Sequence, residues 1–211
     1  MDNSQPTIET GAPPGPLWFE VRAGHGMARL KYFLCGWLML LFFLPALAAA
    51  DSNESAAIEY KVKAGFLYNF VKFVQWPAGA LPSTNSPIVI GLFETDPAAP
   101  VLEQALQQKT ANGHSLQVRR FRPDESPVNC HLFFLSRAER AQTGRVLERF
   151  KGLPVLTVSE SEGFARSGGM INFVMKEENI RFEINLAAAE RAGLQISSKL
   201  ATMATLVKPS N

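Results

Sequence analysis

The sequence has few cysteines and few histidines, the residues that most often build disulfide frameworks and transition-metal sites. It contains two cysteines, Cys35 and Cys130, and three histidines. Cys35 falls in a predicted export signal described below, so a mature chain would keep only Cys130, which excludes an intramolecular disulfide. The histidines after that signal, His114 and His131, have no second ligand at metal spacing. We therefore expect neither a disulfide nor a metal site.

Phosphate-binding loops and catalytic motifs are also missing. The segment after the first predicted strand, Gly91–Pro97, matches neither G-x-G-x-x-G nor a P-loop. Ser197, Ser198 and Lys199 lack the spacing of an S-x-x-K motif, and we can assemble no other pair of nucleophile and base. The sequence thus predicts a protein that is not an enzyme and has no cofactor.

Charges of the two signs nearly balance, with 21 Lys and Arg against 19 Asp and Glu. Nucleic-acid-binding proteins usually carry a basic run or a basic patch with interleaved aromatic residues. The densest basic cluster, Arg119–Arg122, is better explained as the solvated end of a strand. We therefore expect no nucleic-acid partner.

A segment near the N-terminus has the three parts of a cleavable signal peptide. Arg29 and Lys31 are positive, the apolar run Tyr32–Leu47 follows them, and Ala46–Ala50 offers small residues for cleavage. The apolar run is shorter than the ~20 residues that a membrane-spanning helix needs. We predict a signal peptide over residues 27–50 and a periplasmic location for the mature protein.

The residues before the signal are rich in proline and glycine and show no apolar periodicity. Such a composition cannot bury enough surface to offset chain entropy. We predict that residues 1–26 are a misassigned or disordered extension, that Met27 is the true start, and that residues 51–211 form a single α/β domain.

The mature region alternates predicted helices and strands. Apolar residues recur at every fourth position from Ile58 to Val74, which predicts an amphipathic helix ended by Pro77. Such an alternation predicts a three-layer α/β sandwich, in which helices flank a mixed β-sheet. The predicted strands are Ile88–Phe93, Leu116–Phe121, Leu132–Leu135 and Val155–Val158, and the predicted helices between them are Ala98–Lys109 and Arg137–Phe150.

A β-hairpin and a helix are predicted at the C-terminal end. Met170–Met175 is an extended apolar segment, and Lys176–Asn179 is a turn. The next strand, residues 180–185, alternates apolar and polar side chains, which is typical of a strand with one buried face. A last helix is predicted to begin at Ser197, whose hydroxyl is a suitable cap.

Two separated blocks of sequence resemble a known family. The first is Glu59–Pro77, EYKVKAGFLYNFVKFVQWP, and the second is the region 155–206, with glycines at 163, 168 and 169. Together they make the chain, over roughly residues 56 to 207, similar to the YfiR family of periplasmic regulators, and two blocks in order are more specific than one short motif.

The resemblance implies a function. It suggests a small α/β protein that binds the periplasmic sensor region of an inner-membrane diguanylate cyclase, represses it, and so lowers cyclic di-GMP and biofilm formation. Characterised YfiR-type proteins carry several cysteines that pair, whereas Cys130 here has no partner. We expect Cys130 to be a buried structural thiol, and its missing partner argues against the redox regulation that the resemblance implies.

Several residues are candidates for partner or ligand binding. Arg181, Glu183 and Asn185 share one face of the predicted last strand, and Ser198 and Lys199 follow it, so we predict one polar patch. The alternative is an ordinary solvated sheet face, in which Arg181 pairs with a neighbouring glutamate.

Tyr68 and Trp76 are the aromatic candidates. They fall off the apolar stripe of the first predicted helix, and exposed aromatic residues often anchor protein partners. A second functional class stays open at this point, a small-ligand sensor or solute-binding module with a pocket near Arg181 and Lys199. The sequence also leaves open whether the protein forms a homodimer.

Overall fold

The computed structural model describes residues 54–81, 83, 85–126 and 129–209. The predicted extension over residues 1–26 and the predicted signal peptide over residues 27–50 lie outside these residues. In the described part of the chain, no helix is both long and apolar enough to cross a bilayer.

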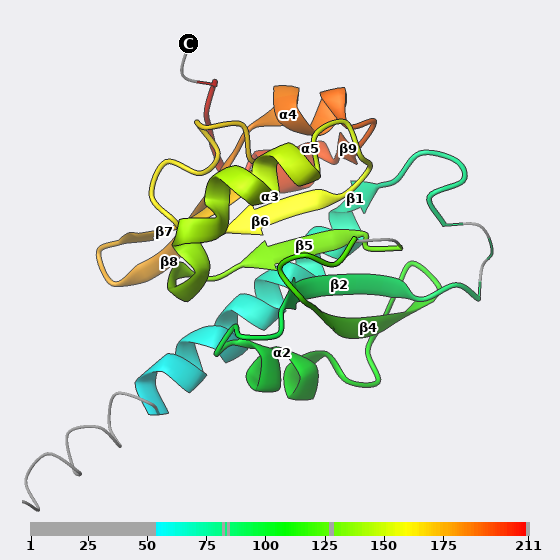
Figure 1. Cartoon of the computed structure of the whole chain (residues 1–211). Helices are drawn as coiled ribbons and strands as arrows, with labels where there is room; N and C mark the ends of the chain where they lie inside the picture. The colour runs from blue at the N-terminus through cyan, green and yellow to red at the C-terminus, as the bar shows by residue number, and fades with distance from the viewer. Residues whose placement is uncertain (1–53, 82, 84, 127–128, 210–211) are drawn as a thin grey trace, which may run out of the picture. The chain divides into compact units, whose positions relative to one another are not determined.

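The described residues form a mixed β-sheet of eight strands (Figure 1). Five neighbouring strands, from β4 to β7, run parallel and include almost continuous apolar runs, as is usual for strands covered on both faces. In spatial order the strands are β10 (Thr205–Leu206), β8 (Asn179–Ile184), β7 (Ile171–Lys176), β6 (Leu156–Ser159), β5 (Leu132–Leu135), β2 (Ile88–Phe93), β4 (His114–Phe121) and β3 (Thr110–Ala111).

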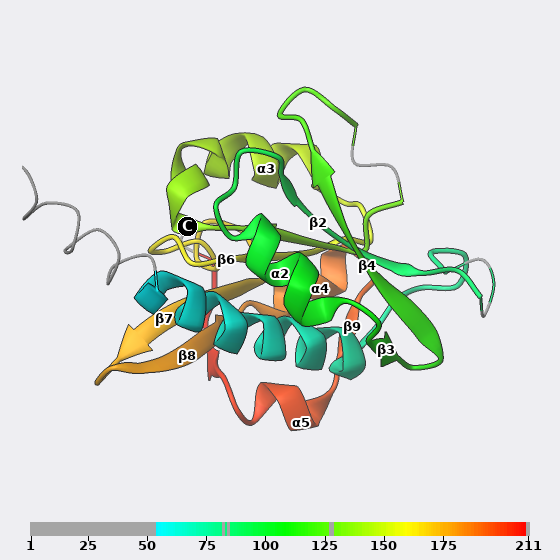
Figure 2. The same cartoon turned by 90° about the horizontal axis from the view of Figure 1, so that it is seen from below.

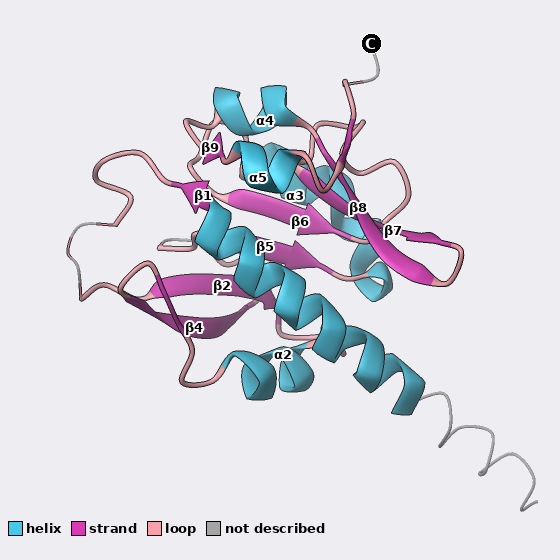
Figure 3. Ribbon diagram, turned by 180° about the vertical axis from the view of Figure 1, so that it is seen from behind, coloured by secondary structure: helices cyan, strands magenta, loops and turns pink. Residues whose placement is uncertain are grey.

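Helices cover both faces of this sheet (Figure 2). The first helix, residues 54–73, crosses one face together with α2 (Ala99–Leu106), as Figure 3 shows. The 3₁₀ helix η1 (Arg137–Gln142) leads into α3 (Thr143–Arg149) on the opposite face. Each face has its own buried apolar cluster. The predicted three-layer sandwich with a mixed sheet is therefore confirmed.

The C-terminal region confirms the predicted hairpin and helix. β7 and β8 pair in antiparallel register, and Glu177 and Glu178 in their turn have φ angles of 51° and 63°, which suit a tight hairpin turn. α4 (Leu186–Arg191) follows, then β9 (Gln195–Ile196), which pairs with β1 (Val74–Gln75). In α5 (Ser198–Ala201), the Ser197 hydroxyl accepts from the Leu200 amide as predicted.

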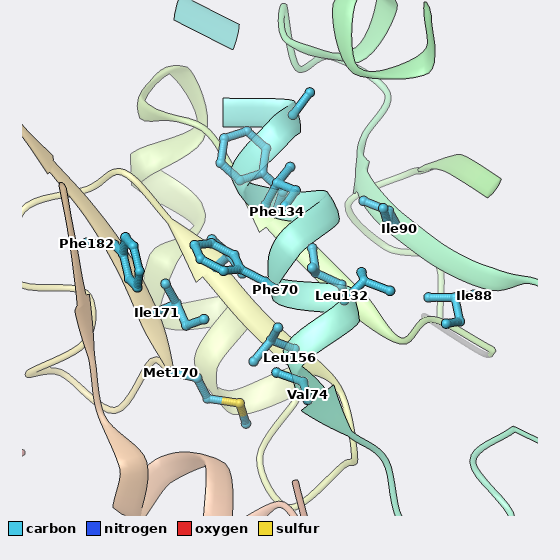
Figure 4. Close-up of a cluster of buried hydrophobic side chains, with 14 of the residues drawn as sticks. Phe70, Val74, Ile88, Ile90, Leu132, Phe134, Leu156, Met170, Ile171 and Phe182 are labelled. Atoms are coloured by element: carbon cyan, nitrogen blue, oxygen red, sulfur yellow. The ribbon is translucent and has the colours of Figure 1, made fainter. Parts of the chain in front are cut away.

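The first helix buries a different stripe from the predicted one. Residues spaced by four rotate about 40° per step around a helix, so a stripe from Ile58 to Val74 cannot stay on one side. The C-terminal half is buried, with Phe70 packed against β7 and β8 (Figure 4), whereas Ile58 and Val62 are exposed. The helix therefore has an apolar surface that the described domain does not cover.

Candidate functional site

Tyr68 and Trp76 are half-buried and hydrogen-bonded inside the protein. The Tyr68 hydroxyl donates to the Thr110 carbonyl at 3.1 Å, and Trp76 Nε1 donates to the His131 carbonyl at 3.2 Å. The Trp76 and His131 rings also meet edge to face. Both candidate aromatics therefore tie the end of the first helix and the strand after it to the sheet.

The predicted polar face of β8 is only partly formed. Arg181 is exposed, and Glu183 pairs with Arg166 at 3.3 Å. Asn185 is fully buried, since its Oδ1 accepts from the Ala188 amide at 3.0 Å and its Nδ2 donates to the Ala165 carbonyl at 2.8 Å. The prediction that Asn185 shares the exposed face is wrong, because the strand alternation stops where Asn185 caps α4.

Ser198 and Lys199 do not join Arg181 in one patch. The Phe182 ring lies 5.1 Å from that of Phe70, so this side of β8 faces the first helix and Arg181 points to the opposite side. Lys199 Nζ lies 5.3 Å from the ring centroid of Phe73, near the end of the first helix. The predicted single patch is therefore wrong, because the sheet separates its members.

The strand order makes the carboxyl ends of the parallel strands a second candidate site. Numbered along the chain, the five parallel strands have the spatial order 2-1-3-4-5, which is a doubly wound arrangement. α2 follows β2 on one face and α3 follows β5 on the other, so the connections diverge between β2 and β5. Ligands of α/β proteins usually bind at the carboxyl ends of strands at such a point.

The side chain of Asp96 occupies this position between β2 and β5. It follows β2 and is buried, and its carboxylate accepts from the Ala98 amide at 2.9 Å and from the Ser136 amide, after β5, at 3.2 Å. Burial raises the pKa of the Asp96 carboxyl above its ordinary value, and these two hydrogen bonds oppose the rise.

A second buried carboxylate, Glu160, links the next strand to the first helix. It follows β6 and forms an ion pair with Lys63, a fully buried lysine of the first helix that also contacts Glu59. Glu160 Oε1 further accepts from the Arg137 amide at 2.7 Å and the Tyr60 hydroxyl at 3.2 Å. We call Tyr60, Lys63, Asp96 and Glu160 the carboxyl-end cluster.

The electrostatics of this cluster suit a structural link better than acid–base chemistry. Burial, followed by the charges of Glu160 and Asp96, raises the pKa of Tyr60 well above its ordinary value, so the phenol stays protonated and donates. Backbone amides at such a site often bind an anionic ligand. Here the amides that follow β2 and β5 donate to the Asp96 and Glu160 carboxylates instead. The cluster fixes the first helix to the carboxyl ends of the sheet.

Sequence reasoning missed Lys63 and Glu160 because they lie 97 positions apart. A lysine among apolar residues on a helix carries no sign of its distant partner. The only local signal was Glu59, one helical turn before Lys63, and such a pair is usually exposed and weak.

Beside this cluster, the first helix and the hairpin leave an apolar surface uncovered. Ile58, Val62 and Met175 are 56%, 46% and 52% exposed. Phe66, one turn after Val62, contacts the rings of β7 and β8, and Met175 pairs across the hairpin with half-buried Ile180. We call these five residues the helix–hairpin surface. Three of the large apolar side chains exposed in the described region thus gather at one place.

The open edge of β8 lies next to this surface. β10 pairs with β8 only at Glu183 and Ile184. In the part of the chain that the structure describes, no strand lies beside the outer edge of residues 179–182. An unpaired edge next to exposed apolar side chains is a common docking place for another chain.

Cys130 and the histidines have structural positions. Cys130 is buried and its Sγ donates to the Leu132 carbonyl at 3.1 Å, and burial raises the pKa of its thiol to about 12, which disfavours the thiolate form. His131 is buried, while His114 bonds the Ser86 carbonyl. Within the described ranges, no group of three His, Cys, Asp or Glu residues could hold a metal ion.

Comparison with protein-family models gives a match. The model of a family described as YfiR/HmsC-like matches residues 60–205, which contain the carboxyl-end cluster and most of the helix–hairpin surface. No curated protein matches the chain.

Proposed function

The chain belongs to the YfiR/HmsC-like family, and we propose that it is a periplasmic protein that binds the periplasmic sensor region of an inner-membrane diguanylate cyclase and represses it. The family is one of regulators of cyclic di-GMP signalling rather than of catalysts. In this proposal the signal peptide over residues 27–50 exports the protein, and the folded domain acts on the cyclase without chemistry of its own.

The observation that carries the proposal is the helix–hairpin surface. A partner that covers Ile58, Val62 and Met175 would remove from water the largest group of exposed apolar side chains that we find in the described region. Repression needs only a higher affinity for the inactive state of the cyclase. A binder with a ~100-fold preference shifts that equilibrium by about 2.7 kcal/mol.

The test combines a deletion strain with two matched variants. We expect deletion of the gene to raise the cellular concentration of cyclic di-GMP, and we expect the wild-type protein to restore the normal concentration. Val62→Asp should fail to restore it, because a carboxylate would be buried at the interface. The control is Leu153→Asp, which replaces another exposed apolar residue, far along the chain in the loop before β6. This variant should restore the normal concentration of cyclic di-GMP fully.

Equal cyclic di-GMP in the wild-type and deletion strains would contradict the proposed repression. Normal repression by Val62→Asp, with the protein present at the wild-type level, would instead reject the helix–hairpin surface and leave repression intact. Circular dichroism of both purified variants shows whether either has unfolded.

A further inference from the structure

A groove lies at the carboxyl ends of the parallel strands, on the outer side of Glu160. Its volume is about 790 Å³, within the range of small-molecule sites. Glu160 and Ser161 after β6 form one part of its wall, and the end of β7 forms another. The lining residues are Arg137, Arg140, Thr143, Glu160, Ser161, Glu162, Phe173, Val174 and Met175.

Two arginines of the groove lack a side-chain partner. Arg137 and Arg140 are exposed, and neither guanidinium makes an ion pair or hydrogen bond in the described part of the chain. They are three residues apart in η1, which is kinked at Glu139, and both line the groove. Guanidinium groups without a hydrogen-bond partner in the protein are free to hold a carboxylate between them.

A buried hydroxyl gives an independent indication of a ligand. Ser161 lines the groove, and its Oγ is buried without a hydrogen-bond partner among the described residues. Buried polar atoms nearly always have a partner in the protein, in water or in a ligand. By contrast, Glu160 is fully used by Lys63, Tyr60 and the Arg137 amide, so it is not available to a ligand.

The charge and the apolar wall define the ligand further. The lining sets Arg137 and Arg140 against Glu160 and Glu162, and the charge of Lys63 behind Glu160 is shared with Glu59, so the groove has no large excess of positive charge and suits a monoanion better than a dianion. Val174 and Met175 offer apolar contacts. We propose that the groove binds a small monocarboxylate with an apolar body, its carboxylate held by Arg137 and Arg140 and its body against β7.

Isothermal titration of the purified protein with three probes tests this assignment. Octanoate carries both features, 1-octanol has the apolar body without the charge, and acetate has the carboxylate without the long apolar body. We expect octanoate to bind at least about tenfold more tightly than either of the others. Arg140→Gln should weaken octanoate about tenfold or more. Arg145→Gln, an exposed arginine of α3 outside the groove, should leave it unchanged.

Three results would overturn the assignment. They are no heat of binding with millimolar octanoate, equal octanoate affinity in Arg140→Gln and the wild type, and 1-octanol or acetate binding as tight as octanoate. Ser161→Ala removes the buried hydroxyl and is a second test, since it should also weaken the binding of octanoate. Any effect of the ligand on the cyclase rests on the proposed function, whereas these titrations do not.

Discussion

The two ends of the parallel strands are held together by different chemistry. At the amino ends, His131 and Trp76 make hydrogen bonds between neutral groups. At the carboxyl ends, Lys63, Asp96 and Glu160 are buried, and Lys63 and Glu160 neutralise each other in an ion pair. At the amino ends, loss of one hydrogen bond lowers the free energy of unfolding only modestly. At the carboxyl ends, loss of one charge leaves its partner unpaired in the protein interior.

The difference also concerns what each end is connected to. The amino-end contacts fix a short segment after the first helix, whereas the carboxyl-end cluster fixes the half of that helix whose outer side carries Ile58 and Val62. Glu160 in addition lines the groove proposed to bind a carboxylate. The charged end therefore lies where a ligand and a partner could affect each other.

The largest expected effect is the loss of Lys63. Lys63→Ala leaves the buried Glu160 carboxylate with only the Tyr60 and Arg137 donors, and breaking a buried pair in this way costs about 3–5 kcal/mol of unfolding free energy. Urea unfolding monitored by circular dichroism measures it. Lys61→Ala, an exposed lysine of the same helix, is the control and should change stability by less than about 0.5 kcal/mol.

The double variant Lys63→Met, Glu160→Gln sharpens the same point. It removes both charges and keeps most of the volume, so it should be more stable than Lys63→Ala. If the single variant loses less than about 1 kcal/mol, the buried charges do not depend on each other as the comparison requires.

The parts of the fold that could be predicted from the sequence are those set by local patterns. The apolar runs Ile88–Phe93 and Leu132–Leu135 become β2 and β5 with unchanged bounds, and the alternation after residue 179 becomes β8. These patterns work because burial on one or both faces of a strand leaves a direct record in neighbouring residues.

The candidate site could not be predicted because its residues meet only in the folded chain. Lys63 reaches Glu160 because the first helix crosses the carboxyl ends of the sheet, which no local pattern encodes. Asn185 was misplaced for a different reason, since one residue ends the strand and caps the next helix. An alternation read from sequence does not show where a strand gives way to a cap.

A smaller effect is expected at the amino ends. Trp76→Phe keeps an aromatic ring and removes the Nε1 hydrogen bond to the His131 carbonyl, which still accepts from the Leu156 amide at 2.8 Å. The free energy of unfolding should fall by about 1 kcal/mol. Urea unfolding measures it, and a loss as large as that of Lys63→Ala would remove the contrast between the two ends.

The smallest effect is a pH dependence at His131. Its Nδ1 accepts from the Val89 amide at 3.0 Å and its Nε2 donates to the Ala80 carbonyl at 3.0 Å, so the ring is neutral. Burial, with the nearby His114 as a smaller cause, lowers the pKa of His131 below 6.5. Below that pH the unfolded chain takes up a proton that the folded protein does not, so stability falls with falling pH.

His131→Asn tests this dependence because its amide oxygen can still accept from Val89 while the group no longer titrates. Unfolding free energies are compared at about pH 7.5 and about pH 5.5, on either side of the ordinary histidine pKa. The variant should be less stable at the higher pH because it loses the bond to Ala80, yet it should lose less than the wild type on acidification. Equal losses would assign the acid sensitivity to other groups, such as those of the charged end.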